Sequence, residues 1–330
     1  MTRAIPTFGT VGTNQPTVPH TAVFTTLYRM SPNVLYKKLT KFGKTLVHSK
    51  PLMFSARQGY VRPSQGKDWF LTTTTVWNCD EMIRRRVRDW RRLTEETGHD
   101  GARNETFRVD HDSVYTGTHS VFPSPLMEWI ILRYGGQPGS SILDAFAGGP
   151  PRGVVSSIMG HKYTGFEIRQ DQIDENEEVL KKMDLKGARY LLKDGRFLDI
   201  DEQFDCAITC PPYFNLEVYS EQPDDISAFG TYAEFNASMW LCAHAHRERM
   251  KPDGFVCIVV GPFRDKKTGE LVDFRSHTVE NFRDAGFLFW QEIILSKNFA
   301  SAAKRSTNSW KGLKLVPRHE FLLIFRAPPK

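Results

Sequence analysis

Long apolar runs are absent from this 330-residue chain, and cysteine is scarce. No run of about eighteen apolar residues that would span a bilayer occurs, and no charged segment followed by an apolar one opens the sequence. The five cysteines are scattered and lack a Cys-x-x-Cys pair: Cys79, Cys206, Cys210, Cys242 and Cys257. Such a pattern argues against a disulfide framework and a zinc site. We therefore expect a soluble protein without a metal that is kept inside a reducing cell.

Acidic residues are missing from the first part of the chain, where ten Lys/Arg precede the first of them, Asp68. Residues 1–110 contain 18 Lys/Arg and 9 Asp/Glu, whereas residues 111–330 contain 26 and 29. A basic region on a nearly neutral body is typical of polyanion binding, although an ordinary solvated basic face has the same composition. Within it, RRRVRDWRR (84–92) predicts an arginine-rich helix suited to phosphate contacts through Arg84, Arg85, Arg86, Arg88, Arg91 and Arg92.

From residue 111 onward, strand patterns alternate with helical ones. Strands are predicted at 140–146, 162–168, 188–194, 204–210, 254–261, 286–295 and 319–327. Helices are predicted at 124–135, 153–161, 171–183, 232–250 and 277–286. This order predicts an α/β fold with a doubly wound, mainly parallel sheet in one domain, 111–330, preceded by the basic N-terminal region, 1–110.

In such a sheet, ligands bind beyond the carboxyl ends of the strands. These ends carry DAFAGG (144–149), Glu167, Asp194 and TCPPY (209–213). The two glycines of the first loop permit a nucleoside-sized ligand to approach the backbone, although a plain strand-to-helix turn also uses glycine. Glu167 is placed to accept hydrogen bonds from ribose hydroxyls, unless it is a surface carboxylate. Asp194 either binds the ligand or forms a turn with the glycine after it.

Three segments resemble motifs of the S-adenosylmethionine-dependent DNA amino-methyltransferases, which modify adenine N6 or cytosine N4. Residues 144–149 are similar to their cofactor motif, and Cys210-Pro211-Pro212-Tyr213 is similar to their catalytic motif, (Asp/Asn/Ser)-Pro-Pro-aromatic. VFPSPLMEWII (121–131) is similar to the segment before the first strand in many members. The resemblance covers 120–326, and CPPYFNLEVYS with DAFAGGPPRG is similar in particular to bacteriophage methylases.

The resemblance implies a Rossmann-like methyltransferase fold whose seven-stranded sheet is closed by an antiparallel hairpin. It implies S-adenosylmethionine as cofactor, held by Phe122, Pro123, Asp144, Phe146, Gly148, Gly149, Glu167 and Asp194. The last of these would meet the amino group of the cofactor adenine. It further implies catalysis by Cys210, Pro211, Pro212 and Tyr213. The expected partner is double-stranded DNA, bound by a monomer or homodimer in the cytoplasm of a bacterial host cell.

The Pro-Pro-Tyr sequence suits a reaction on a base amino group. A base inside a duplex hides this group, so the enzyme must flip the base out, and the ring of Tyr213 offers a stacking face. The two prolines hold the backbone so that a main-chain carbonyl, not used in a strand, accepts a hydrogen bond from the target nitrogen. The alternative is that Pro211-Pro212 only ends an edge strand.

Cys210 departs from the family motif, because a thiol is a weaker acceptor than Asp, Asn or Ser. Three interpretations stay open at this point. The thiol replaces serine and amino methylation survives; or it is the nucleophile of a cytosine-C5 methyltransferase; or the chain is a non-catalytic DNA-binding protein. Methylation of RNA at adenine N6 is a further alternative, since the same signature serves RNA enzymes.

A second basic segment lies between the last two predicted strands. Residues 297–319 contain six Lys/Arg, no acidic residue, and two interleaved aromatic side chains. Long loops of this kind are functional or disordered, and interleaved basic and aromatic residues are typical of nucleic-acid contacts. The predicted DNA-binding residues of this loop are Lys304, Arg305, Trp310 and Lys311.

Overall fold

An eight-stranded sheet organises the part of the chain that the computed structural model describes, which is residues 76–78, 122–216, 218–220, 222–296 and 312–329. Its strand order is β1-β9-β10-β6-β5-β2-β3-β4. The strands are β1 (Val76–Asn78), β2 (Ser141–Asp144), β3 (Lys162–Glu167), β4 (Ala188–Leu192), β5 (Phe204–Thr209), β6 (Met250–Val260), β9 (Leu288–Ser296) and β10 (His319–Arg326).

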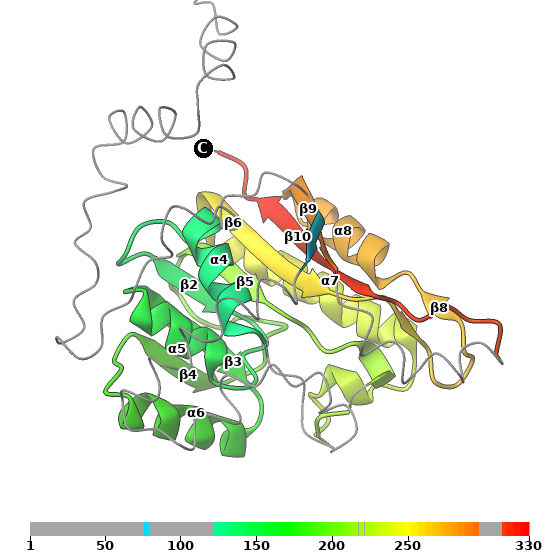
Figure 1. Ribbon diagram of the computed structural model, residues 1–330, viewed down its shortest axis with the longest axis horizontal. Coiled ribbons are helices and arrows are strands. Elements are labelled where there is room, and N and C mark those ends of the chain that lie inside the picture. Colours follow the sequence, from blue (N-terminus) through cyan, green and yellow to red (C-terminus); the bar gives the residue numbers. More distant parts are fainter. Residues whose placement is uncertain (1–75, 79–121, 217, 221, 297–311, 330) are drawn as a thin grey trace, which may run out of the picture. The chain divides into compact units, whose positions relative to one another are not determined.

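The pairing confirms the predicted doubly wound, mainly parallel sheet (Figure 1). Strands β2 to β6 pair in parallel, and β10 lies antiparallel between β6 and β9. All seven predicted strands are present, with β9 and β10 forming the antiparallel hairpin. The eighth strand, β1, belongs to the basic N-terminal region and pairs in parallel with β9.

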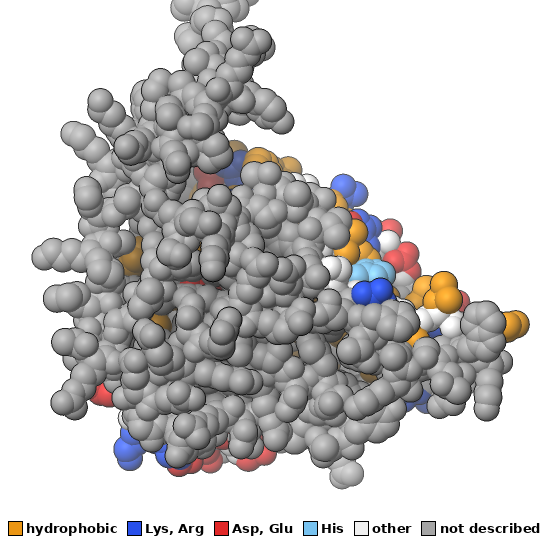
Figure 2. Space-filling model, in the orientation of Figure 1, with side chains coloured by type: hydrophobic (Ala, Val, Ile, Leu, Met, Phe, Trp, Pro, Cys, Tyr) orange, Lys and Arg blue, Asp and Glu red, His pale blue; other side chains and the backbone are white. Residues whose placement is uncertain are grey.

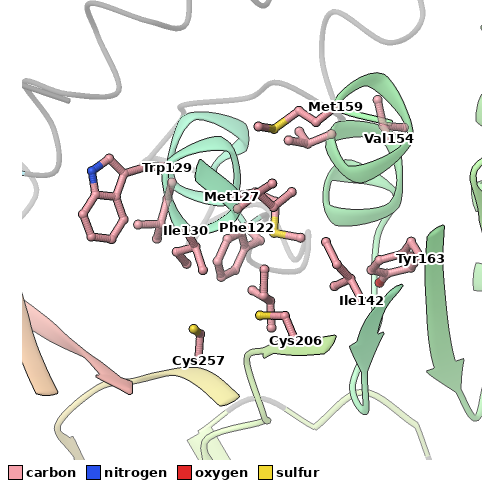
Figure 3. Close-up of a cluster of buried hydrophobic side chains, with 14 of the residues drawn as sticks. Phe122, Met127, Trp129, Ile130, Ile142, Val154, Met159, Tyr163, Cys206 and Cys257 are labelled. Carbon is pink, nitrogen blue, oxygen red and sulfur yellow. The ribbon is translucent and has the colours of Figure 1, made fainter. Parts of the chain in front are cut away.

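Helices cover both faces of the sheet. They are α4 (Ser124–Tyr134), α5 (Pro151–Ile158), α6 (Gln170–Lys182), α7 (Tyr232–Arg249) and α8 (Phe274–Asp284). Side chains from α4, α5 and α6 share one buried cluster with the sheet, and side chains from α7 and α8 share another. Figure 3 shows part of the first cluster, between α4, α5 and the strands below them. None of the described helices is long and apolar enough to cross a membrane.

The ends of the helices follow from local chemistry. Helix α4 stops at Tyr134 because two glycines follow, and the second, Gly136, has a positive φ of 80° that favours glycine. Helix α7 begins with a capping box in which Thr231 and Glu234 satisfy each other's backbone N–H groups.

Several predicted boundaries were wrong, including both ends of α5, which was expected at 153–161. Helix α8 begins at Phe274 rather than His277, because the side chain of Asp273 accepts a hydrogen bond from the backbone N–H of Ser276 and caps the helix earlier. Strand β6 begins at Met250 rather than Gly254, so the segment expected as the end of α7 pairs with β5 instead. The sequence pattern also missed the short hairpin of β7 (Phe263–Arg264) and β8 (Leu271–Val272).

Two short 3-10 turns, η4 (Phe214–Leu216) and η5 (Ile226–Ala228), follow the end of β5. The buried carboxylate of Asp225 orders this loop by accepting hydrogen bonds from the backbone N–H and hydroxyl groups of Ser220 and Ser227. The chain that follows Tyr213 is therefore held by an internal polar network.

Candidate active site at the carboxyl edge of the sheet

The carboxyl ends of the parallel strands meet at one edge of the sheet. Asp144 ends β2, Glu167 ends β3, and Cys210 directly follows β5. Hydrogen bonds join these ends: the Gly148 N–H donates to Glu167 Oε2 at 3.0 Å, and the Thr209 hydroxyl donates to Asp144 Oδ1 at 2.8 Å. The predicted cofactor loop is thereby joined to β3 and to the start of the predicted catalytic motif.

Asp144 is the centre of this arrangement and is completely buried. Its Oδ2 accepts from Arg152 Nε at 2.5 Å and from the Tyr163 hydroxyl at 2.7 Å. Its Oδ1 accepts from the Thr209 hydroxyl and from the Phe146 N–H at 3.1 Å. Four protein donors thus use the carboxylate. This geometry supports a positioning role for Asp144, and its predicted contact with the cofactor stays a prediction.

Arg152 is the main site residue that the sequence interpretation missed. Besides Asp144, it donates from Nη2 to the carbonyl oxygens of Phe146 and, at 2.9 Å, of Ala147. Burial alone would lower the pKa of Arg152, but the charge of Asp144 more than offsets this and keeps the guanidinium ionised. Its position just after the glycine loop, in GGPPRG, was the available signal, because a basic residue there can bind the loop's own carbonyls.

Phe122 and Pro123 lie at the start of α4. Phe122 is buried in the cluster of Figure 3, and the Arg152 guanidinium lies 4.9 Å from the centre of its ring. Pro123 is the N-cap residue of α4. The segment therefore supports the anchor of the glycine loop, and its predicted contact with the cofactor remains a prediction.

The glycine loop leaves room beside its backbone. Gly148 has a φ of 50°, and no atom lies within 4 Å of the place where a Cβ would stand. Its carbonyl is fixed by the Asn176 side chain, whose Nδ2 donates at 2.7 Å. Phe146 and Gly149, on either side, are half-buried. A ligand can approach this rigid segment closely, as the predicted cofactor site requires.

Glu167 is half-buried and lies beside the backbone of Gly148. Its Oε2 accepts from Gly148, and its Oε1 accepts from the backbone N–H groups of Ile168 and Arg169, each at 3.0 Å. Burial raises the pKa of Glu167, and these hydrogen bonds only partly offset that effect. Because a carboxylate has about four acceptor positions, Oε2 can accept one more hydrogen bond, as the predicted contact with a ribose hydroxyl requires.

Asp194, two residues beyond β4, binds Arg196. Its Oδ1 accepts from the Arg196 N–H at 2.8 Å, and its Oδ2 accepts from Arg196 Nε at 2.7 Å. Arg196 also pairs with Asp224 at 3.2 Å and lies 5.4 and 5.5 Å from the ring centres of Phe197 and Phe229. Asp194 thus links the end of β4 to the loop that follows the catalytic motif, a connection that the sequence interpretation missed.

The glycine after Asp194 brings this loop against the cofactor loop. A Cβ on Gly195 would stand 1.9 Å from the carbonyl oxygen of Ala145. Only glycine allows the two backbones to approach so closely. Asp194 therefore lies beside the glycine loop, which is the position its predicted role needs, although the role itself stays a prediction.

The predicted catalytic motif continues directly from β5. Thr209 ends the strand, and Pro211-Pro212 follows without regular structure. The Tyr213 ring is half-buried, lies nearly parallel to Phe263 with ring centres 6.2 Å apart, and meets Phe274 edge-on at 6.0 Å. Two aromatic side chains that the sequence did not predict therefore fix the orientation of this tyrosine.

Cys210 is half-buried at the head of the motif and interacts with the Tyr213 hydroxyl. Burial raises the pKa of the Cys210 thiol to about 12, and the nearby charge of Arg152 offsets only part of this rise. At neutral pH the side chain is therefore a protonated thiol, a weak hydrogen-bond acceptor and a poor nucleophile.

The predicted DNA-binding residues of segments 84–92 and 297–311 lie outside the described residues. Figure 2 shows basic, acidic, histidine and hydrophobic side chains mixed along the margin of the described surface near β8. Charges of both signs are therefore mixed along this margin, and neither sign predominates there. Within the described ranges, no group of three or more His, Cys, Asp or Glu is arranged to hold a metal ion.

Comparison with known proteins adds a family to this geometry. A family model described as DNA methylase matches residues 204–330, from the first residue of β5 through the catalytic motif to the end of the chain. This matched part, which is less than half of the chain, is similar to the DNA methylase family. Members use S-adenosylmethionine, which confirms the predicted cofactor. No match was found among curated proteins.

Solved structures similar to the chain include TrmN from Thermus thermophilus, with 12% identity and a TM-score of 0.45, covering 66% of this chain and 52% of that one. A S-adenosylmethionine-dependent methyltransferase from Methanosarcina mazei has 15% identity and a TM-score of 0.41, with coverage of 61% and 98%. A Streptococcus mutans methyltransferase in complex with SAH has 16% identity and a TM-score of 0.37, with coverage of 58% and 90%. The chain thus spans about half the length of the Thermus protein. The assignment of the chain to a doubly wound, mainly parallel fold is based on its own strand order and not on these similarities.

Proposed function

We propose that the protein is a DNA methyltransferase that transfers a methyl group from S-adenosylmethionine to an exocyclic amino nitrogen, adenine N6 or cytosine N4, of a flipped base. The observation that carries this proposal is the hydrogen bond between Thr209 and Asp144, at 2.8 Å. It joins the methylase motif that starts at Cys210 to the loop that fits the cofactor. Methyl donor and target base would therefore be held by two adjoining loops.

The chain's own residues supply positioning. Gly148 and Glu167 line the space that fits the nucleoside part of the cofactor, which supplies the electrophilic methyl group when bound. The Pro211-Pro212 pair presents a main-chain carbonyl to the target amino group, which orients the nitrogen lone pair. Tyr213, held by neighbouring rings, stacks on the flipped base, a contact worth about 1–3 kcal/mol by analogy with single-strand binding.

The environment of Cys210 favours amino methylation over cytosine-C5 methylation. A C5 mechanism needs a thiolate that adds covalently to the ring. A thiol with a pKa of about 12 supplies this nucleophile poorly at neutral pH. We therefore infer that Cys210 occupies the position of serine in the motif without acting as a nucleophile.

Double-stranded DNA is the proposed polymer. The basic region 1–110 and the basic loop 297–319 support it, because phosphate contacts dominate the affinity of proteins for DNA. RNA is the alternative that the same motif allows.

Nucleoside mass spectrometry tests the proposal. DNA and RNA from a methylation-free bacterial host that expresses the protein are digested and compared with nucleic acid from cells that express Tyr213→Ala. We expect N6-methyladenine or N4-methylcytosine in DNA with the parent protein and a large loss with the variant. C5-methylcytosine, methylation confined to RNA, or no modified base would contradict the proposal.

A further inference from the structure

The first residues of β10 place a carboxylate at the candidate active site. Strand β10 runs antiparallel to β6, and Phe321 pairs with Val260. Continuing this register by one position sets Glu320 opposite Gly261, immediately beyond the carboxyl end of β6. Because β5 lies on the other side of β6, the same edge also carries Cys210.

Glu320 and Cys210 lie on the same face of the sheet. Side chains alternate between the two faces of a strand. Leu322 and Ile324 of β10 belong to the same buried cluster as Ile208 of β5, and Cys210 packs against that cluster. Glu320 shares its parity with the first two, so its side chain is directed to the face on which Cys210 lies.

Gly261 opens a path between these groups. A Cβ built on it would stand 3.1 Å from Glu320 Cγ, 3.1 Å from Tyr213 Cε2 and 3.3 Å from the Tyr213 hydroxyl. The stem of Glu320 and the tyrosine ring therefore both border the space above the bare glycine. The charge of Glu320 acts on both neighbours and contributes to the raised pKa of Cys210 and of Tyr213.

The Glu320 carboxylate can supply the hydrogen-bond acceptor that the motif lacks at position 210. The family motif begins with an acceptor side chain, whereas Cys210 is a protonated thiol. The target amino group has N–H donors, and its nitrogen must lose one proton when it becomes methylated. A half-buried carboxylate beside the tyrosine can accept the hydrogen bond and then the proton.

We propose that Glu320 is a catalytic residue that accepts a hydrogen bond from the target amino group in place of the missing acceptor at position 210. The inference rests on the proposed function. In the transfer, the nitrogen lone pair forms the N–C bond, and the electron pair of the broken S–C bond stays on sulfur. The proton leaves the nitrogen for the Glu320 carboxylate and passes to water.

The test removes the carboxylate at position 320 and, in a second variant, places one at position 210 instead. Single-turnover methylation of DNA from a methylation-free bacterial host is measured with radiolabelled S-adenosylmethionine for the parent, for Glu320→Gln and for Cys210→Asp/Glu320→Gln. We expect Glu320→Gln to slow transfer about 100-fold, the lower end of general acid–base effects, with S-adenosylmethionine affinity unchanged. The double variant should regain at least about tenfold of that rate, since the aspartate restores the family acceptor.

Two further variants separate catalysis from folding. Glu292→Gln, which alters a half-buried carboxylate on β9 that pairs with Arg275, should leave the rate unchanged. Glu320→Asp keeps the charge with a shorter reach and should lie between the parent and Glu320→Gln. A Glu320→Gln rate near that of the parent, a Glu320→Asp rate below that of Glu320→Gln, or a double variant no faster than Glu320→Gln would overturn the inference alone. A parent that does not methylate the DNA would overturn the proposed function and the inference with it.

Discussion

Replacing Arg152 by methionine should destabilise the fold severely. The change keeps an apolar stem but removes the cation that donates to the buried carboxylate of Asp144 at 2.5 Å. Removing one partner of a buried ion pair costs about 3–5 kcal/mol, because a charge is left uncompensated. The carbonyls of Phe146 and Ala147 lose a donor as well. The loss is thus a large part of the roughly 5–15 kcal/mol that stabilises a typical domain.

Urea denaturation followed by circular dichroism measures this loss. The matched control is Lys182→Met, which breaks an exposed pair with Glu178 on α6 and should change the unfolding free energy little. Under conditions in which Arg152→Met is folded, calorimetry should also show weaker S-adenosylmethionine binding, since the glycine loop has lost its anchor. Equal unfolding free energies for the two variants would refute the view that Arg152 and Asp144 hold the site together.

Four other outcomes are expected. Burial lowers the pKa of His161 and His246 to about 4, so the unfolded chain binds more protons than the folded one between pH 6.5 and 4. The free energy of unfolding should therefore fall over this range by up to about 1.4 kcal/mol per pH unit for each histidine. Urea titrations in which His246→Gln keeps the parent's slope of unfolding free energy against pH would contradict this. Glu167→Ala should weaken calorimetric S-adenosylmethionine binding by about 1.5–3 kcal/mol, and unchanged affinity would remove the ribose contact. Neutralising Lys/Arg in 297–319 should reduce the salt dependence of DNA binding by about 0.9 in log–log slope per lost phosphate contact, and an unchanged slope would exclude the loop. Cys210→Ser should retain methylation, and complete inactivity together with a covalent adduct on 5-fluorocytosine DNA would instead support C5 chemistry.

The sheet could be predicted from the sequence because its strands are short apolar runs that end at glycines, prolines or charged residues. DAFAGG after β2 and TCPPY after β5 carry glycines and prolines that cannot continue a strand. Since parallel strands end at one edge, the predicted loops meet there, and the hydrogen bond from Gly148 to Glu167 is consistent with that reasoning.

Tertiary pairing accounts for what the sequence could not predict. The sequence predicts Asp144 as a cofactor residue but does not predict its structural role, which depends on donors 2, 8, 19 and 65 positions away in the chain. The place of Glu320 depends on the register of β10 against β6, which no local pattern encodes. The contact between Phe263 and Tyr213 could likewise not be predicted, because the two-residue strand that carries Phe263 has no detectable periodicity.

Asp144 and Glu320 have roles that the sequence motifs alone do not indicate. Asp144 supports the predicted cofactor loop, and Glu320 is the proposed acceptor for the target amino group. Burial and four donors make Asp144 the support of the predicted cofactor loop, and its own contact with the cofactor stays a prediction. Cys210 heads the motif where the family has an acceptor, but its protonated thiol is suited to packing. The acceptor chemistry then falls to a carboxylate on a different strand. Because a hydrogen-bond acceptor acts through its position relative to the target nitrogen, and not through its place in the chain, a motif with cysteine in front is compatible with amino methylation.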